Sequence, residues 1–268
     1  MDDRPIGMFD SGFGGLSVAR ALIDLLPAEH LVYLGDTGRY PYGPRPQDEV
    51  RGFARQIIER LVDDHGVKLV IVACNTAAAT GLATLQEHVA VPLIGVIEPG
   101  VWSLALATLS GRVGVIGTVG TVASGAYQRA VAELAPQLEL TCAACPGFVE
   151  FVERGETRSD QVAVLAERLL APVREAKVDA LLLGCTHYPF LARTLSDAMG
   201  RDVVLVSSAD ETAFEVRRRL EGTELARDPA AGPGTHRWLS SGDVAWFQHL
   251  GQQLLGPELG EVEPVTWD

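Results

Sequence analysis

The stretch KLVIVACNTAA, residues 68–78, decides the fold together with its counterpart ALLLGCTHYPF, residues 180–190. Each is a continuous apolar run that ends in a cysteine and continues with small polar residues. Apolar runs without alternation are typical of strands that a parallel sheet buries on both faces. Cys74 and Cys185 are 185 − 74 = 111 residues apart. A disulfide, a metal site, core packing and a pair of catalytic thiols all remain compatible with these two stretches.

Similar apolar runs recur along the chain. Amphipathic stretches at 15–27, 48–66 and 159–177 alternate with them and predict helices. Strand, helix and strand at this rhythm indicate parallel βαβ units and an α/β fold. The candidate strands are PIGMFD (5–10), HLVYLGD (30–36), KLVIVAC (68–74), PLIGVI (92–97), RVGVIGT (112–118), ALLLGC (180–185) and DVVLVSS (202–208).

The two halves of the chain resemble each other. Asp10 ends a strand 74 − 10 = 64 residues before Cys74, and Thr118 ends one 185 − 118 = 67 residues before Cys185. We interpret this as two similarly built α/β domains with a boundary near 97–100, a coincidence of a repetitive pattern being the alternative. The segment 236–256 predicts a strand and a helix capped by Asp243, and it could complete either domain.

Composition limits the class of protein. The net charge is −13, from 35 acidic and 22 basic residues, which argues against a nucleic-acid-binding face. The first residues lack a secretory signal, and no apolar run is long enough to suggest a transmembrane helix. Four cysteines are too few for a disulfide scaffold in a chain of this length. We therefore expect a cytoplasmic protein with free thiols.

Polar residues follow the apolar runs where the strands end. Ligands of open parallel sheets bind beyond this carboxyl edge, because loops and helix N-termini converge there. The loop DTGRYPYGPR (36–45), with exposed backbone donors, follows one of these strands. The residues expected at the edge are Asp10, Ser11, Asp36, Thr37, Cys74, Asn75, Thr76, Thr118, Cys185, Thr186 and His187.

Two thiols at equivalent strand ends suit one reaction in particular. Inversion of an amino-acid α-carbon requires a base on one face and an acid on the other, and His187 could move a proton beside Cys185. No lysine follows these strands to bind pyridoxal phosphate, so a cofactor-free route is plausible. Cys142 and Cys145 form a lone CxxC without further metal ligands, which makes a metal or redox site the weaker interpretation.

Six ordered motifs carry a resemblance to a known family. The chain resembles the bacterial glutamate racemases of the aspartate/glutamate racemase superfamily, with a weaker match in LSSGDVAWF (239–247). The matching motifs are DSGFGG (10–15), DTGRYPYGPR (36–45), ACNTAA (73–78), GTVGT (117–121), ACPGFVEFVERG (144–155) and GCTHYP (184–189).

The resemblance implies a fold and an activity. It implies two similar parallel-sheet α/β domains that face a shared cleft, a discontinuous first domain of 1–97 plus 208–268 and a second of 98–207. It also implies interconversion of L- and D-glutamate with no cofactor and no metal. This isomerase reaction would supply D-glutamate for peptidoglycan synthesis, and so for cell wall biogenesis and cell shape.

The resemblance also assigns residues. Cys74 would deprotonate D-glutamate and Cys185 L-glutamate, with Asp10 and His187 assisting the respective thiols. Glu153 matches a further assisting acid, although Glu150 stands where the family usually has proline. The matching substrate-binding residues are Asp10, Ser11, Tyr42, Gly43, Asn75, Thr76, Thr118, Thr186 and His187.

Other interpretations remain open beside this one. The shared motifs bind the amino-acid head more clearly than the side chain, so a racemase for aspartate or another acidic amino acid is the main alternative. A metal or redox protein that uses the thiols is the other. We expect a small-molecule substrate, no nucleic acid and no membrane, and a homodimer is compatible with the resemblance. Relatives activated by a cell-wall precursor carry an N-terminal extension, and only nine residues precede Asp10, so we expect no such activation.

Overall fold

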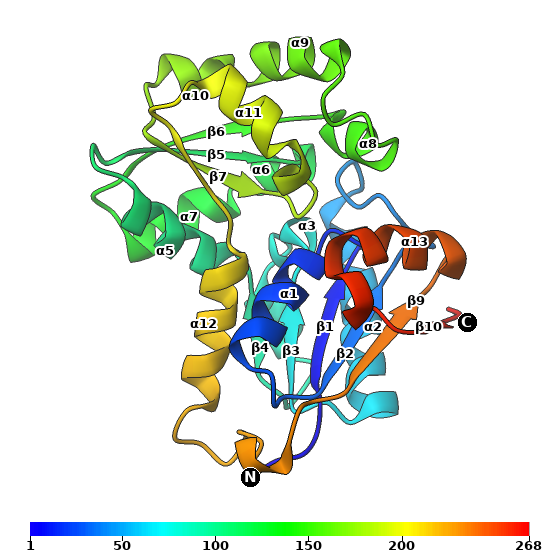
Figure 1. Ribbon diagram of the computed structural model, residues 1–268. Coiled ribbons are helices and arrows are strands. Elements are labelled where there is room, and N and C mark those ends of the chain that lie inside the picture. The colour runs from blue at the N-terminus through cyan, green and yellow to red at the C-terminus, as the bar shows by residue number, and fades with distance from the viewer. Residues whose placement is uncertain (268) are drawn as a thin grey trace. The chain divides into compact units, whose positions relative to one another are not determined.

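The computed structural model describes residues 1–267, which divide into two compact units (Figure 1). Unit 1 comprises Met1–Val96 and the segment from Ala209 to the C-terminus, and unit 2 comprises Ile97–Ser208. Each unit is built on one parallel sheet, as the sequence predicts. Among the residues that the structure describes, no helix combines the length and the apolarity that crossing a bilayer requires. The domain limits that the sequence predicts remain a proposal.

Unit 1 contains a six-stranded sheet in the order β10-β9-β2-β1-β3-β4. Its strands are β1 (Ile6–Asp10), β2 (Leu31–Gly35), β3 (Leu69–Val72), β4 (Leu93–Gly95), β9 (His236–Ser240) and β10 (Val262–Pro264). Every residue of β1, β2 and β3 is buried, which explains why these strands lack an alternating pattern. The helices are α1 (Leu16–Leu25), α2 (Gln47–His65), α3 (Asn75–Ala78), α4 (Leu82–Gln86), α12 (Ala209–Leu220) and α13 (Val244–Leu255).

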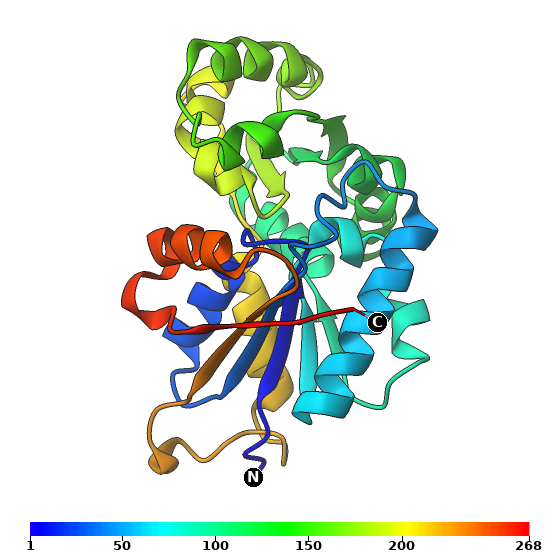
Figure 2. The same cartoon turned by 90° about the vertical axis from the view of Figure 1, so that its right-hand side faces the viewer.

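Helices cover both faces of this sheet. Helix α1 contacts α12 and α13 on one face, and α2 lies on the other face with α4 (Figure 2). The C-terminal segment completes unit 1, because β9 pairs with β2 and with β10. Asp243 caps α13 as predicted, and its Oδ1 accepts a hydrogen bond of 2.9 Å from the amide of Trp246.

Unit 2 contains a four-stranded parallel sheet in the order β6-β5-β7-β8. Helices α5 and α7 pack together beside β7, while α9, α10 and α11 form a second group (Figure 1). The strands are β5 (Arg112–Gly117), β6 (Glu139–Ala144), β7 (Ala180–Gly184) and β8 (Val204–Val206). The helices are α5 (Ile97–Ala107), α6 (Val119–Ala123), α7 (Ala126–Leu134), α8 (Phe148–Glu153), α9 (Asp160–Leu169), α10 (Ala171–Glu175) and α11 (Ala192–Met199).

Several predicted limits differ from the structure. All seven predicted strands occur, but the run 92–97 forms strand only over Leu93–Gly95, and Ile97 begins α5. The predicted helix 159–177 is two helices separated at Leu170, just before Pro172, whose ring cannot donate a backbone hydrogen bond. Strands β6 and β10 were not predicted: β6 is mostly half-exposed and β10 has only three residues, one of them proline.

One buried ion pair holds together the end of unit 1 where β3 begins. Lys68 is fully buried, and its Nζ lies 2.5 Å from Glu29 Oε2 and donates to the carbonyl of Asp2 at 3.0 Å. The other carboxylate oxygen, Glu29 Oε1, accepts from the amide of Arg227 at 2.9 Å. The pair therefore links the N-terminal residues, the α1–β2 loop and the segment after α12.

Replacing Lys68 should destabilise unit 1 strongly. Lys68→Met keeps the alkyl stem but leaves the Glu29 carboxylate buried without its counter-ion, which should lower the free energy of unfolding by about 3–5 kcal/mol. Urea denaturation followed by circular dichroism measures this loss. Arg237→Met is the matched control, because Arg237 and Glu263 form an exposed pair, whose removal should cost no more than about 1 kcal/mol. Equal, small losses in both variants would contradict this account.

Candidate active site

The carboxyl edge of the unit 1 sheet gathers Asp10, Asp36 and Cys74. Strand β1 lies between β2 and β3, and its register pairs Asp10 with Gly35 and Phe9 with Val72. Beyond the strands, the amide of Asp36 donates to the carbonyl of Asp10 at 2.9 Å. The amide of Ala73 likewise donates to the carbonyl of Phe9 at 2.9 Å. The three side chains therefore follow adjacent strand ends, as the sequence predicts.

A tight turn after β1 fixes the position of Asp10. Asp10 is fully buried, and its Oδ1 accepts from the amide of Gly12 at 2.9 Å. The hydroxyl of buried Tyr33 donates to the carbonyl of Gly12 at 3.1 Å. At Gly15, a Cβ atom would lie 2.6 Å from the Asp10 Cβ and 2.8 Å from the Tyr33 Oη, so only glycine fits. Sequence reasoning missed Tyr33, because it lies inside an apolar run.

Cys74 is a buried thiol at the start of α3. It is 4% exposed, and its Sγ donates to the Ser11 Oγ at 3.7 Å. Burial raises the pKa of the Cys74 thiol from about 9 to about 11, and the charge of Asp10 contributes to the rise of that pKa. Hydrogen bonds from the Ala77 amide and from Ser11 oppose the rise. At neutral pH the resting group is the thiol.

The remaining predicted residues of unit 1 lie in the same region of the fold. Asn75 and Thr76 follow Cys74 in α3 and are 3% and 4% exposed. Tyr42 is buried in the loop after β2, its hydroxyl donates to Asp36 Oδ2, and Gly43 beside it is partly exposed. Burial and the charge of Asp36 raise the pKa of Tyr42 well above its usual range. This tyrosine is therefore a neutral hydrogen-bond donor.

The carboxyl edge of the unit 2 sheet gathers Thr118, Cys185, Thr186 and His187. Gly117 pairs with Gly184, so Thr118 and Cys185 follow adjacent strand ends. Cys185 is 6% exposed, and burial together with the charges of Cys142 and Cys185 raises the pKa of the Tyr127 hydroxyl. Thr118 Oγ1 accepts from the Thr121 amide at 3.2 Å, which caps α6.

A carboxylate faces His187 from α8. The Nε2 atom of His187, a residue that is 2% exposed, lies 3.6 Å from Glu153 Oε1. Glu150 on the same helix is exposed. Tyr188 follows His187 in the chain and holds this segment in place, since its buried hydroxyl donates to the Cys145 carbonyl at 3.0 Å. Of the two acidic residues, Glu153 is the one that faces His187.

The CxxC pair lies at the end of β6. Cys142 is part of β6, and Cys145 is buried beyond the end of that strand. Burial raises the pKa of Cys142 to about 11 and that of Cys145 to about 12, so both are protonated thiols at neutral pH. Within residues 1–267, no three histidine, cysteine or carboxylate side chains cluster as metal ligands would.

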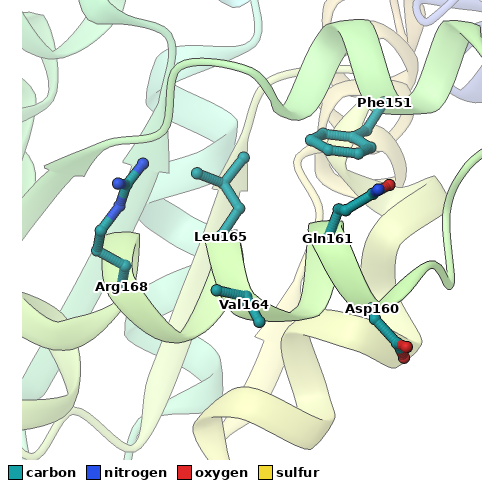
Figure 3. A pocket seen from close by; sticks show the side chains of 6 residues that line it. All are labelled: Phe151, Asp160, Gln161, Val164, Leu165 and Arg168. Atoms are coloured by element: carbon teal, nitrogen blue, oxygen red, sulfur yellow. The ribbon is translucent and has the colours of Figure 1, made fainter.

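An open groove in unit 2 is lined by other residues than these (Figure 3). Its volume is roughly 440 Å³, and helices α8 and α9 form it. Phe151, Val164 and Leu165 give it an apolar lining, with Arg168 and Asp160 near its ends. None of the residues predicted for catalysis lines this groove, and its apolar surface does not suit the ammonium and carboxylate of an amino acid.

Each sheet edge therefore presents one buried thiol, a carboxylate or imidazole group and short hydroxyl or amide side chains. These groups can move protons, and they can hold the charged head of an amino acid. The fold and the residues together define an α/β protein with one buried thiol at the carboxyl edge of each parallel sheet.

The particular family follows from comparison with known proteins. The model of the Asp/Glu/Hydantoin racemase family matches residues 6–215, and this chain belongs to that family. It is 50% identical over 262 residues to a glutamate racemase of Acidothermus cellulolyticus, covering 98% of this chain and 99% of that relative.

Solved structures agree with this assignment. A glutamate racemase of Bacillus anthracis superposes with a TM-score of 0.91 at 38% identity, covering 100% of this chain and 98% of that one. The glutamate racemase of Francisella tularensis in complex with D-glutamate superposes with a TM-score of 0.90 at 32% identity, covering 99% and 98%. The chain is thus an isomerase with the racemase fold.

The charge of Asp10 should control the ionisation of Cys74. Asp10→Asn removes the charge that raises the pKa of the thiol, so at pH 8 the thiolate fraction and the alkylation rate of Cys74 should rise roughly threefold. Peptide mass spectrometry after timed iodoacetamide treatment measures this rate. In the unmodified protein the rate should keep increasing up to about pH 11. Asp24→Asn, at an exposed position of α1, should change nothing; an unchanged or slower rate in Asp10→Asn would contradict the assignment.

Proposed function

We propose that this protein is a glutamate racemase that interconverts L- and D-glutamate by proton transfer through Cys74 and Cys185, without a cofactor. The observation that carries the proposal is the pair of buried thiols that follow the carboxyl ends of β3 and β7, strands that pair with β1 and β5 respectively. Family membership and the identity of 50% to a glutamate racemase over almost the whole chain support glutamate as the substrate.

The proposed reaction moves one proton in and one proton out. The Cys74 thiolate removes the α-proton of D-glutamate, which breaks the Cα–H bond and forms an S–H bond. The electron pair left on Cα delocalises into the α-carboxylate. The Cys185 thiol then gives its proton to the opposite face of Cα, which yields L-glutamate and a Cys185 thiolate. The reverse reaction starts from Cys185 and restores the first state.

The raised pKa of Cys74 suits a base that acts on carbon. A thiolate of high pKa is a stronger base, although only a small fraction of it exists at neutral pH. The ammonium group of the substrate, bound nearby, would favour the thiolate by supplying a positive charge. We propose Asp10 as the group that assists Cys74 and holds that ammonium, with Ser11, Asn75 and Thr76 contacting the rest of the amino-acid head.

On the other side, we propose that His187 and Glu153 assist Cys185. The distance of 3.6 Å between His187 Nε2 and Glu153 Oε1 supports a pair in which the carboxylate orients the imidazole. Thr118, Thr186 and His187 would bind substrate from unit 2, and Tyr42 with Gly43 would bind it from unit 1. Substitution of these residues tests the proposed roles.

The cellular role follows from the proposed product. D-Glutamate is a component of peptidoglycan, so we propose that the enzyme supplies it in the cytoplasm for cell wall synthesis and maintenance of cell shape. We also propose that it forms a homodimer. We further propose that the chain has two domains, a first of 1–97 with 208–268 and a second of 98–207.

Aspartate is the alternative substrate. The hydroxyl and amide side chains at both sheet edges suit the amino-acid head that aspartate and glutamate share, so the residues alone do not separate them. The similarity to glutamate racemases favours the longer side chain.

Replacing either thiol by a hydroxyl should abolish racemisation. Cys74→Ser and Cys185→Ser should each lower kcat/KM for glutamate by about a thousandfold or more, because serine is a far weaker acid. Circular dichroism of the substrate, started from each enantiomer, measures the rate. Cys142→Ser is the matched control and should keep the activity. Turnover of aspartate but not of glutamate would contradict glutamate as the substrate. Full activity in either variant would contradict the two-thiol mechanism. Loss of activity with a chelator would indicate a metal enzyme.

Removal of the carboxylate beside His187 should affect one half of the reaction. Glu153→Gln should lower kcat/KM roughly tenfold and equally from both enantiomers, since the two have equal free energy. The α-deuterium isotope effect should rise with L-glutamate and fall with D-glutamate, because proton removal on the Cys185 side becomes slower. Glu150→Gln, on the exposed face of the same helix, serves as the control. Identical kinetics in the two variants would remove Glu153 from the mechanism.

A further inference from the structure

The carboxylate of Asp36 is the centre of a hydrogen-bond network under the loop that carries Tyr42 and Gly43. Asp36 is fully buried, and within residues 1–267 four side chains donate to it. Oδ2 accepts from the Tyr42 hydroxyl and from Arg39 Nε at 2.7 Å. Oδ1 accepts from Ser241 Oγ at 2.6 Å and from Trp267 Nε1 at 2.8 Å. A buried carboxylate requires such donors, so each of them constrains the loop.

Trp267 makes a second contact with the same network. Its ring lies 4.0 Å from the guanidinium carbon of Arg39, and the ring of Phe53 lies 4.3 Å from that carbon. Arg39 is the counter-ion of Asp36. Trp267 thus contacts both members of the ion pair, the carboxylate through its N–H and the guanidinium through its aromatic face.

The chain before Trp267 is itself held in place. The amide of Val265 donates to the carbonyl of Ser240 at 2.8 Å, which continues the pairing of β10 with β9. Arg60 of α2 donates to the carbonyl of Thr266 at 2.8 Å. Trp267 is therefore fixed from the sheet on one side and from α2 on the other before it reaches Asp36.

We propose that Trp267 is a positioning residue for substrate binding, which acts through Asp36 and Tyr42 on the loop 36–45. The proposal rests on the proposed function, in which Tyr42 and Gly43 contact glutamate. Without Trp267 the carboxylate loses one donor and Arg39 loses one of its two aromatic contacts. The loop then occupies its binding-competent arrangement for a smaller fraction of the time, and the apparent affinity for substrate falls by that fraction.

Two variants separate the contributions of Trp267. Trp267→Ala removes the N–H donor and the ring, and it should raise KM for both glutamate enantiomers about tenfold while kcat changes less than about twofold. Trp267→Phe keeps a ring for Arg39 but lacks the donor, and its KM should fall between those of the unmodified protein and Trp267→Ala. Trp102→Ala, at an exposed position of α5, is the matched control and should behave as the unmodified protein.

Hydrogen exchange of the loop gives a readout that needs no substrate. Backbone amides of residues 36–45 should exchange faster in Trp267→Ala, while those of unit 2 should not change. Unchanged KM and unchanged exchange, or a lowered kcat at constant KM, would overturn the proposal.

Trp267→Phe keeps the proposal testable if Trp267→Ala unfolds. In that case a KM and an exchange rate of Trp267→Phe equal to those of the unmodified protein would refute the role of the N–H. Absence of glutamate turnover in the unmodified protein would refute the proposed function, whereas faster loop exchange would still support the action of Trp267 on the loop.

Discussion

The parallel register of two strand pairs, β1 with β3 and β5 with β7, determines where the reactive side chains lie. In each of these pairs the two strands are parallel and end next to each other. The residues that follow them therefore emerge at the same edge of the sheet. This constraint places Cys74 near Asp10, and Cys185 near Thr118. The strands must be buried on both faces to hold this register, which is why their sequences are continuous apolar runs.

Burial of the thiols follows from the same constraint, and it sets their chemistry. Cys74 is held in a poorly solvated position beside a carboxylate, so its thiolate is scarce but strongly basic. An enzyme that removes a proton from carbon benefits from that basicity, provided that the substrate supplies a positive charge on binding. In unit 2, Glu153 Oε1 lies 3.6 Å from Nε2 of His187, and we propose that this pair assists Cys185.

The sequence predicts these elements to different degrees. Apolar periodicity reveals the buried strands, the polar residues at their ends and the Asp243 cap, because each depends on local residue type. It does not reveal β6, which is mostly half-exposed, or β10, which has only three residues, one of them proline. Tyr33 is hidden in an apolar run, although its hydroxyl fixes the Gly12 carbonyl. Trp267 is 267 − 36 = 231 residues from Asp36, and the pairing of β9 with β2 and with β10 brings the two together.

The central claim is that two thiols act on opposite faces of one glutamate, and isotope incorporation from heavy water tests it most directly. Each enantiomer is incubated separately, and α-deuterium is measured at early conversion in both the product and the recovered substrate. Two separate acid–base groups predict deuterium in the product and none in the recovered substrate, from either direction. Deuterium in the recovered substrate, or product that retains the original proton, would show a single base acting on both faces and would contradict the account.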